Sequence, residues 1–89
     1  SRFKKVAAAV RQVCVQTAEK LGVPVELIGS KKQINQLIKW CWFRDDDTRA
    51  QGLLPDLLEG WRGEHLQAAL TKVDGLNIAQ SISEDSTHA

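Results

Sequence analysis

The chain has 89 residues, of which 43% are hydrophobic and 26% are charged, as in ordinary soluble globular proteins. A chain this short forms one domain, because its apolar residues are too few for two separate cores. The longest uninterrupted apolar run, residues 6–10, excludes a membrane-spanning helix, which needs roughly 20 residues. The chain starts with Ser1 and contains no methionine, so we expect it to be a piece of a larger protein.

The net charge of +1 hides an asymmetry between the two halves of the chain. Residues 1–44 hold nine Lys and Arg against two acidic side chains, whereas residues 45–89 hold three against nine. Neutralising phosphates supplies most non-specific affinity for nucleic acids, and charges act over a screening length of about 8 Å. Two interpretations follow: a basic surface that binds nucleic acid, or a fold that mixes the two halves.

Residues 2–21 are predicted to form a long amphipathic helix, because apolar side chains recur at steps of three and four. Gly22 supplies the left-handed position that ends a helix, and Pro24 prevents continuation while favouring a new first turn. A short helical turn over residues 25–28, ended by Gly29, is therefore expected.

Ser30 and Gln33 form a capping box at the start of the second main helix. Its predicted core face carries Ile34, Leu37, Ile38, Cys41 and Trp42. The opposite, solvent-exposed face carries Lys32, Gln36, Lys39 and Phe43, with Lys31 and Arg44 near its edges. Trp40 lies at the margin of the apolar stripe, so Trp40 or Phe43 could contact a ligand or another domain.

The second half is predicted to hold an exposed loop over residues 45–52, a short helix over 54–60 and a last long helix from residue 61 or 62 to 74. The segment after Asn77 lacks an apolar face. The predicted fold class is therefore all-α: a compact bundle of four to five helices over residues 1–76, with residues 77–89 as a flexible, disordered tail.

Catalytic and metal-binding residues are not recognisable, because a site needs several converging nucleophiles, bases or ligands. Cys14 and Cys41 form no CxxC pair and are expected to be reduced thiols. His65 is expected on a helix surface, and the three aspartates from residue 45 are expected in a solvated loop. We therefore expect no metal site and no cofactor in this chain.

The segment Gly60-Trp61-Arg62-Gly63-Glu64 has the most unusual local composition. As a folding device, Trp61 would staple the helix entry to the core while Arg62 pairs with an acidic neighbour such as Glu59. As a functional site, the helix N-terminus and Arg62 would hold a phosphate. A P-loop is excluded, since no GxxxxGK[ST] pattern occurs.

Several segments in this order carry a family resemblance: LGVPVELI at 21–28, SKKQIN at 30–35, Trp40 and Trp42, LPDLL at 54–58 and GWRGE at 60–64. Over about residues 3–75 the chain resembles the C-terminal HRDC domain of bacterial ribonuclease D. The resemblance implies an all-helical accessory domain that helps a cytoplasmic 3′–5′ exoribonuclease to hold structured RNA such as tRNA precursors. It also implies a separate upstream catalytic domain that uses divalent metal ions.

That catalytic domain is not in this chain, which has no tyrosine and no DxE pair. The first hypothesis is thus a monomeric domain that binds RNA weakly through phosphate contacts from Lys31, Lys32, Lys39, Arg44 and Arg62. The second is an interaction module that docks on the upstream exonuclease domain, which an exposed apolar patch around Trp40 or Phe43 would favour. An HRDC domain of a RecQ-type helicase is an alternative parent, and GWRGE favours the nuclease. An enzyme in its own right is the third hypothesis, and the missing catalytic groups argue against it.

Overall fold

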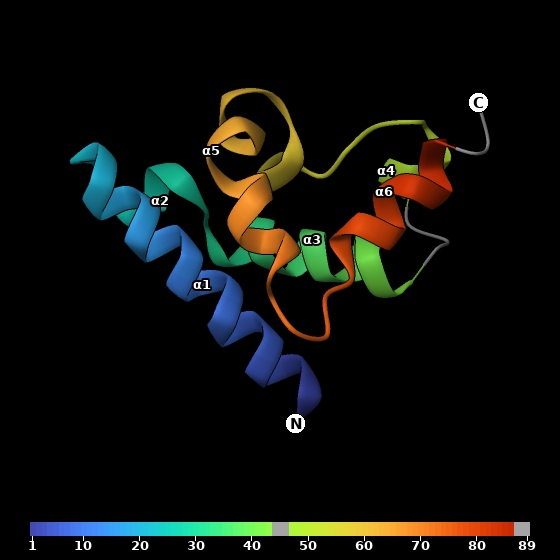
Figure 1. The fold of residues 1–89 in the computed structure, drawn as a ribbon, viewed down its shortest axis with the longest axis horizontal. Coiled ribbons are helices and arrows are strands. Elements are labelled where there is room, and N and C mark those ends of the chain that lie inside the picture. The colour runs from blue at the N-terminus through green and yellow to red at the C-terminus, as the bar shows by residue number, and fades with distance from the viewer. Residues whose placement is uncertain (44–46, 87–89) are drawn as a thin grey trace.

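Helices joined by short loops build the described part of the chain, residues 1–43 and 47–86 of the computed structural model, and no strand occurs there (Figure 1). The all-α prediction is confirmed. The elements are α1 (Arg2–Leu21), α2 (Val25–Ile28), α3 (Lys31–Trp42), α4 (Asp47–Ala50), the 3-10 helix η1 (Asp56–Leu58), α5 (Gly60–Thr71) and α6 (Ile78–Ser86). None of the described helices is long and apolar enough to cross a membrane.

Helix α1 begins and ends at the predicted residues because both of its ends are capped. The Ser1 hydroxyl accepts a hydrogen bond from the Lys4 amide at 3.4 Å. Gly22 adopts the left-handed conformation, with φ 69°, and its N–H donates to carbonyls of the last turn. The buried residues of α1 recur every four positions, at Val6, Val10, Cys14 and Ala18.

Helix α3 begins with the predicted capping box. The Gln33 amide donates to the Ser30 hydroxyl at 3.2 Å, and the Ser30 amide donates to Oε1 of Gln33 at 2.9 Å. Nε2 of the same Gln33 side chain donates to the Asp56 carboxylate at 3.2 Å, which ties the start of α3 to η1. Ile34, Leu37 and Ile38 turn inward as expected.

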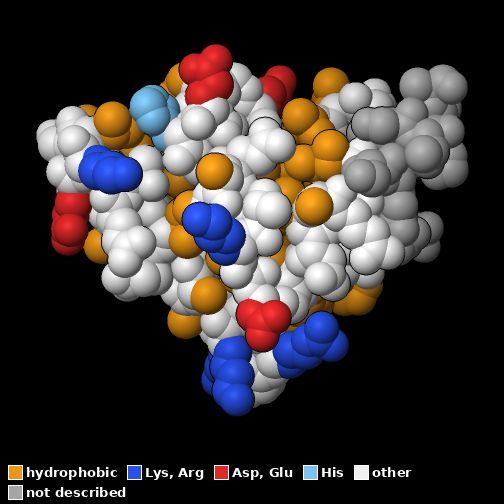
Figure 2. Space-filling model, in the orientation of Figure 1, with side chains coloured by type: hydrophobic (Ala, Val, Ile, Leu, Met, Phe, Trp, Pro, Cys, Tyr) orange, Lys and Arg blue, Asp and Glu red, His pale blue; other side chains and the backbone are white. Residues whose placement is uncertain are grey.

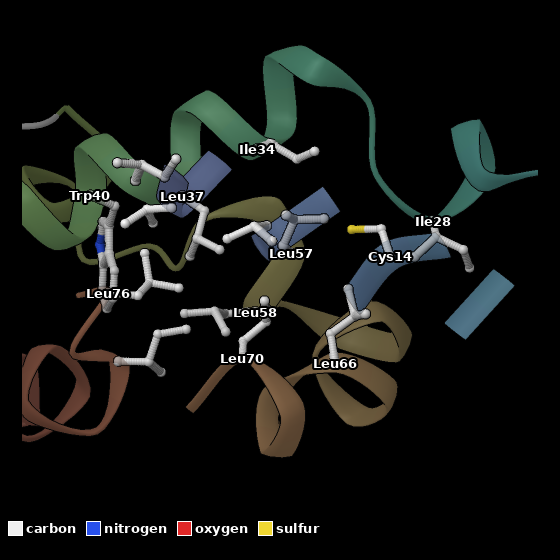
Figure 3. Close-up of a cluster of buried hydrophobic side chains, with 14 of the residues drawn as sticks. Cys14, Ile28, Ile34, Leu37, Trp40, Leu57, Leu58, Leu66, Leu70 and Leu76 are labelled. Carbon is white, nitrogen blue, oxygen red and sulfur yellow. The ribbon is translucent and has the colours of Figure 1, made fainter. Parts of the chain in front are cut away.

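The burial of the two tryptophans of α3 is the reverse of the prediction, which put Trp42 on the core face and Trp40 at the margin of the apolar stripe. Trp40 is fully buried, because its ring lies under the Arg49 guanidinium and against core residues such as Leu76 (Figure 3). Trp42 is half-buried, and its Nε1 donates to the Gly75 carbonyl at 2.9 Å. The hypothesis that Trp40 contacts a ligand is therefore wrong, since its ring is inaccessible.

The core lies between α1, α3 and α5, with η1 inserted among them. Figure 3 shows Leu57 and Leu58 of η1 between the inward side chains of α3 and those of α5, with Cys14 of α1 nearby. Gly63 permits this packing, because a Cβ at that position would overlap the Leu58 carbonyl. The two glycines of the GWRGE segment therefore serve the fold, since Gly60 also has a positive φ of 57°.

The tail expected from residue 77 starts too early, because residues 78–82 lie in helix α6, which starts at Ile78. Ile78 is fully buried and Ile82 packs against the core, so two isoleucines four positions apart provide a short apolar stripe. The Asn77 carbonyl accepts hydrogen bonds from the amide and the hydroxyl of Ser81, both at 3.0 Å. Residues 87–89 lie outside the described part of the chain.

Two smaller boundaries also differ from expectation. Helix α5 ends at Thr71, three residues early, and the chain then turns towards Gly75, which has φ 87°. Part of the expected 45–52 loop forms the single turn α4, whose Arg49 is held against the end of α3. Tertiary contacts explain α4, because a one-turn helix has no stability of its own.

Candidate nucleic-acid interface

The outer face of α3 carries three exposed lysines, Lys31, Lys32 and Lys39. Among the described side chains, none of them forms an ion pair. At 1.5 Å per residue, Lys31 and Lys39 lie about 12 Å apart along the axis, far enough to reach different phosphates of one strand. Arg44, the fourth predicted contact on this helix, lies outside the described residues.

Lys31 lies in a groove between α1 and α3, which we call the α1/α3 groove. It encloses about 450 Å³ and receives Lys4 and Arg11 from α1. None of the described acidic side chains lines it. Ile34 is buried and Phe3 half-buried, so apolar side chains form the floor while the three exposed cations form the rim. The charged side chains that the structure places around this groove are therefore all positive.

Lys32 faces a different environment on the other flank of α3. It lines a hollow of about 410 Å³ together with Arg62 and the acidic Glu26 and Asp56. The Asp56 amide donates to the Gln36 side chain at 3.0 Å, so η1 is fastened to this flank of α3. Acidic groups of η1 and α2 thus stand beside Lys32, and the field there is mixed.

Arg62 is engaged with backbone carbonyls. Its Nε donates to the Ile28 carbonyl at 3.0 Å and its Nη2 donates to the Leu27 carbonyl at 3.1 Å. Its guanidinium carbon also lies 4.5 Å from the centre of the Trp61 ring. The expected pairing of Arg62 with Glu59 is replaced by these bonds, which satisfy the last carbonyls of α2.

Sequence reasoning missed Lys4 and Arg11 as members of a basic cluster. The signal was present, since these residues are seven apart and share one side of α1 beside its apolar stripe. The sequence did not show that this side of α1 faces Lys31 of α3. That neighbourhood depends on how the helices pack.

The face drawn in Figure 2 carries basic and acidic side chains next to one another. At the end where α1 begins, Arg2 and Lys5 share a hollow with Asp74. Folding thus mixes the two charged halves at this end of the face. Among the residues that the structure describes, the charged ones lining the α1/α3 groove are all basic.

Groups for metal binding do not converge within the described residues. No cluster of three His, Cys, Asp or Glu occurs there that could hold a metal ion. His65 is exposed on α5. Burial raises the pKa of the Cys41 thiol to about 11, against the smaller opposing effects of Ser81 and Arg49, and burial also raises the pKa of Cys14. Both thiols therefore stay protonated and unreactive at neutral pH.

Comparisons with known proteins point to one group of nucleases. A family model described as "Ribonuclease D, C-terminal HRDC domain" matches residues 1–70. Ribonuclease D of Shewanella sp. (strain ANA-3) is 35% identical over 74 residues, which are 83% of this chain and 17% of the relative. The identity is 38% over 68 residues for ribonuclease D of Cronobacter turicensis and 35% over 68 residues for that of Escherichia coli (strain K12).

These last two matches cover 76% of this chain and 17% of each relative. The chain thus spans about 17% of the length of the curated relatives it matches. No solved structure matches it significantly.

Proposed function

The chain belongs to the family of ribonuclease D C-terminal HRDC domains, and from this premise we propose that it is a non-catalytic, nucleic-acid-binding accessory domain of a ribonuclease D-like 3′–5′ exoribonuclease. The observation that carries the proposal is the outer face of α3, where Lys31, Lys32 and Lys39 are exposed. The inward face of the same helix is part of the core, so the lysines stand on a rigid support. The RNA would be a tRNA precursor in the cytoplasm.

Phosphate contacts by exposed lysines give modest affinity that falls steeply with salt. Each neutralised phosphate contributes about −0.7 to the logarithmic salt slope of single-stranded binding, so five contacts predict about −3.5. The five proposed contacts are Lys31, Lys32, Lys39, Arg44 and Arg62. Arg62 has two nitrogens committed to α2 carbonyls, so its share comes from Nη1 alone.

Catalysis would belong to the parent's upstream exonuclease domain, which would supply divalent metal ions held by carboxylates. The described side chains of this chain do not fit such a centre, because they provide no cluster of three ligands. The accessory domain would thus raise the local concentration of RNA near the upstream site. A monomeric chain is sufficient for this role.

The proposal is tested by titrating single-stranded RNA with the chain at several salt concentrations. Reversing two charges of α3, with Lys32→Glu and Lys39→Glu, should nearly abolish binding because it replaces attraction for phosphate with repulsion. The matched control is Lys20→Glu with Lys72→Glu, two exposed lysines outside α3 that give the same change in net charge. The proposal would be refuted if the unsubstituted chain showed no salt-dependent association with RNA. It would also be refuted if the control pair lost as much RNA affinity as the α3 pair.

A docking role is the second candidate, because Phe43 at the end of α3 is 59% exposed. Large exposed aromatic side chains are typical of protein contacts. In this role the domain would bind the upstream exonuclease domain and shape its substrate channel without holding RNA. Mixing the chain with the upstream domain distinguishes the two roles: stable association without RNA that is lost in Phe43→Ser supports docking.

A further inference from the structure

We propose that the α1/α3 groove binds one unpaired nucleotide of RNA, with the base on the apolar floor and the adjoining phosphate between Lys4, Arg11 and Lys31. This inference rests on the proposed RNA-binding function and adds a defined subsite to it. The groove would make the domain prefer RNA with an unpaired end over fully paired RNA. Lys32 and Lys39, which lie outside the groove, would bind either kind of RNA.

The charge of the groove favours a phosphate. Lys4 and Arg11 are separated by two helical turns, about 10 Å along α1, and Lys31 faces them from the first turn of α3. The part of the chain that the structure describes puts no carboxylate in the groove, in contrast to the flank of α3 beside Lys32, which Glu26 and Asp56 line. An anion entering between the three cations therefore meets attraction without a competing internal partner.

The floor of the groove favours a flat ring. Ala7 and Ala8 are small, so they leave open space between the long cationic side chains. Phe3 and Ile34 add apolar surface on either side, and the Asn35 amide provides both a donor and an acceptor for a base edge. An apolar floor with a few polar groups is the usual composition of a small-ligand site.

The size of the groove favours a nucleotide over a folded peptide segment. Its volume of about 450 Å³ lies in the range of pockets for single small molecules. A docked amphipathic helix needs a longer apolar channel for anchors on successive turns. An acidic peptide is therefore the competing occupant, and the experiment below includes it as an outcome.

The test compares two hairpin RNAs, one with a short 3′ single-stranded extension and one with a blunt end, in fluorescence anisotropy titrations of the chain. We expect the extended hairpin to bind roughly tenfold more tightly, as the stacking of one base provides. Ala8→Leu fills the groove without changing charge or helix propensity, so it should remove this preference and leave blunt-end binding unchanged. Ala9→Leu is the matched control, because Ala9 is exposed on α1 but lines a different hollow.

A charge test addresses the same groove. Lys4→Gln with Arg11→Gln should lower affinity for the extended hairpin by roughly tenfold, since two phosphate contacts are lost. Lys5→Gln with Lys20→Gln removes the same charge from α1 outside the groove. This pair should lower the affinity for the extended hairpin much less. An equal loss in the two pairs would overturn the subsite, because general electrostatics would then explain it.

The possible failures of the two proposals differ. If both hairpins bind equally and Lys32→Glu with Lys39→Glu still abolishes binding, the subsite is wrong and the RNA-binding function stands. If neither hairpin binds, both proposals are wrong. A third outcome is that the two hairpins bind with equal affinity, while an acidic peptide of alternating Glu and Leu binds the chain and Ala8→Leu abolishes that binding. The groove would then hold a protein segment, and the nucleotide subsite would be wrong.

Discussion

Arg49 of α4 and Arg62 of α5 each stack on a tryptophan ring and donate to carbonyls at the end of a helix, and α4 and α5 lie apart in Figure 1. The Arg49 guanidinium carbon lies 4.1 Å from the centre of the Trp40 ring, and its Nη2 donates to the Trp40 carbonyl at 2.9 Å. Arg62 stacks on Trp61 at 4.5 Å and donates to two carbonyls at the end of α2. Each arginine thus closes a helix C-terminus, where the helix dipole favours a cation.

The difference between the two lies in the tryptophan. Trp40 is fully buried, whereas Trp61 is 48% exposed. Water can replace the exposed bond of Arg62 to Leu27 and can reach the Trp61 ring, but it cannot reach the covered ring of Trp40. The same stacked arrangement should therefore contribute much more to stability at the Arg49 end, because cation–π contacts and hydrogen bonds strengthen when desolvated.

The largest expected effect is that of Arg49→Ala. It leaves the part-buried Trp40 carbonyl without this donor and uncovers the ring, so we expect the free energy of unfolding to fall by about 2–4 kcal/mol. Urea denaturation measures the change. Arg49→Lys keeps the charge but not the planar fork, and should recover less than half of the loss. A loss below about 1 kcal/mol would mean that burial does not set the two ends apart.

Alkaline pH should also weaken the Arg49 end, through Cys41. Its folded pKa is raised to about 11 from 9.0, so the unfolded thiol ionises first as pH rises. The contribution of the neutral, buried Cys41 thiol to the free energy of unfolding is complete below pH 9 and is lost as the pH approaches 11. After allowance for partial exposure we expect a loss on the order of 1–2 kcal/mol. Urea denaturation at pH 8 and 10.5 should show that the free energy of unfolding of Cys41→Ala declines less than that of the unsubstituted chain. An equal decline in the two chains would contradict the role of Cys41.

The smallest expected effect is that of Arg62→Ala, about 1 kcal/mol, because its bond to the Leu27 carbonyl is exposed and solvent can replace it, which leaves the part-buried bond to Ile28 as the main loss. The same variant tests Arg62 as a phosphate contact. With two of its nitrogens committed to α2, it should weaken RNA binding less than Lys39→Glu does. A stability loss as large as that of Arg49→Ala would erase the contrast between the two ends.

Local signals in the sequence were sufficient for the bounds of α1 and α2 and for the start of α3. Ser30 with Gln33 and Gly22 act within one turn of the helix end they define, so their effect could be predicted without knowing the fold. The outward placement of Lys31, Lys32 and Lys39 followed from helical periodicity for the same reason.

The features that were missed depend on contacts between distant segments. Arg49 was placed in a loop, because no local pattern predicts that it covers Trp40 nine residues earlier. The stripe of α6 consists of Ile78 and Ile82 within a polar segment, which is too short for periodicity to stand out. In the same way, Lys4 and Arg11 become neighbours of Lys31 only after α1 packs against α3.

The Gln33 side chain forms hydrogen bonds both within its own helix start and with a segment that is distant in the sequence. Gln33 accepts a hydrogen bond from the first residue of its own helix start and donates another to Asp56, 23 positions later. The opening of the α3 N-terminus and the detachment of η1 therefore break bonds of the same side chain. We expect amide hydrogen exchange to report these two segments as a single cooperative unit.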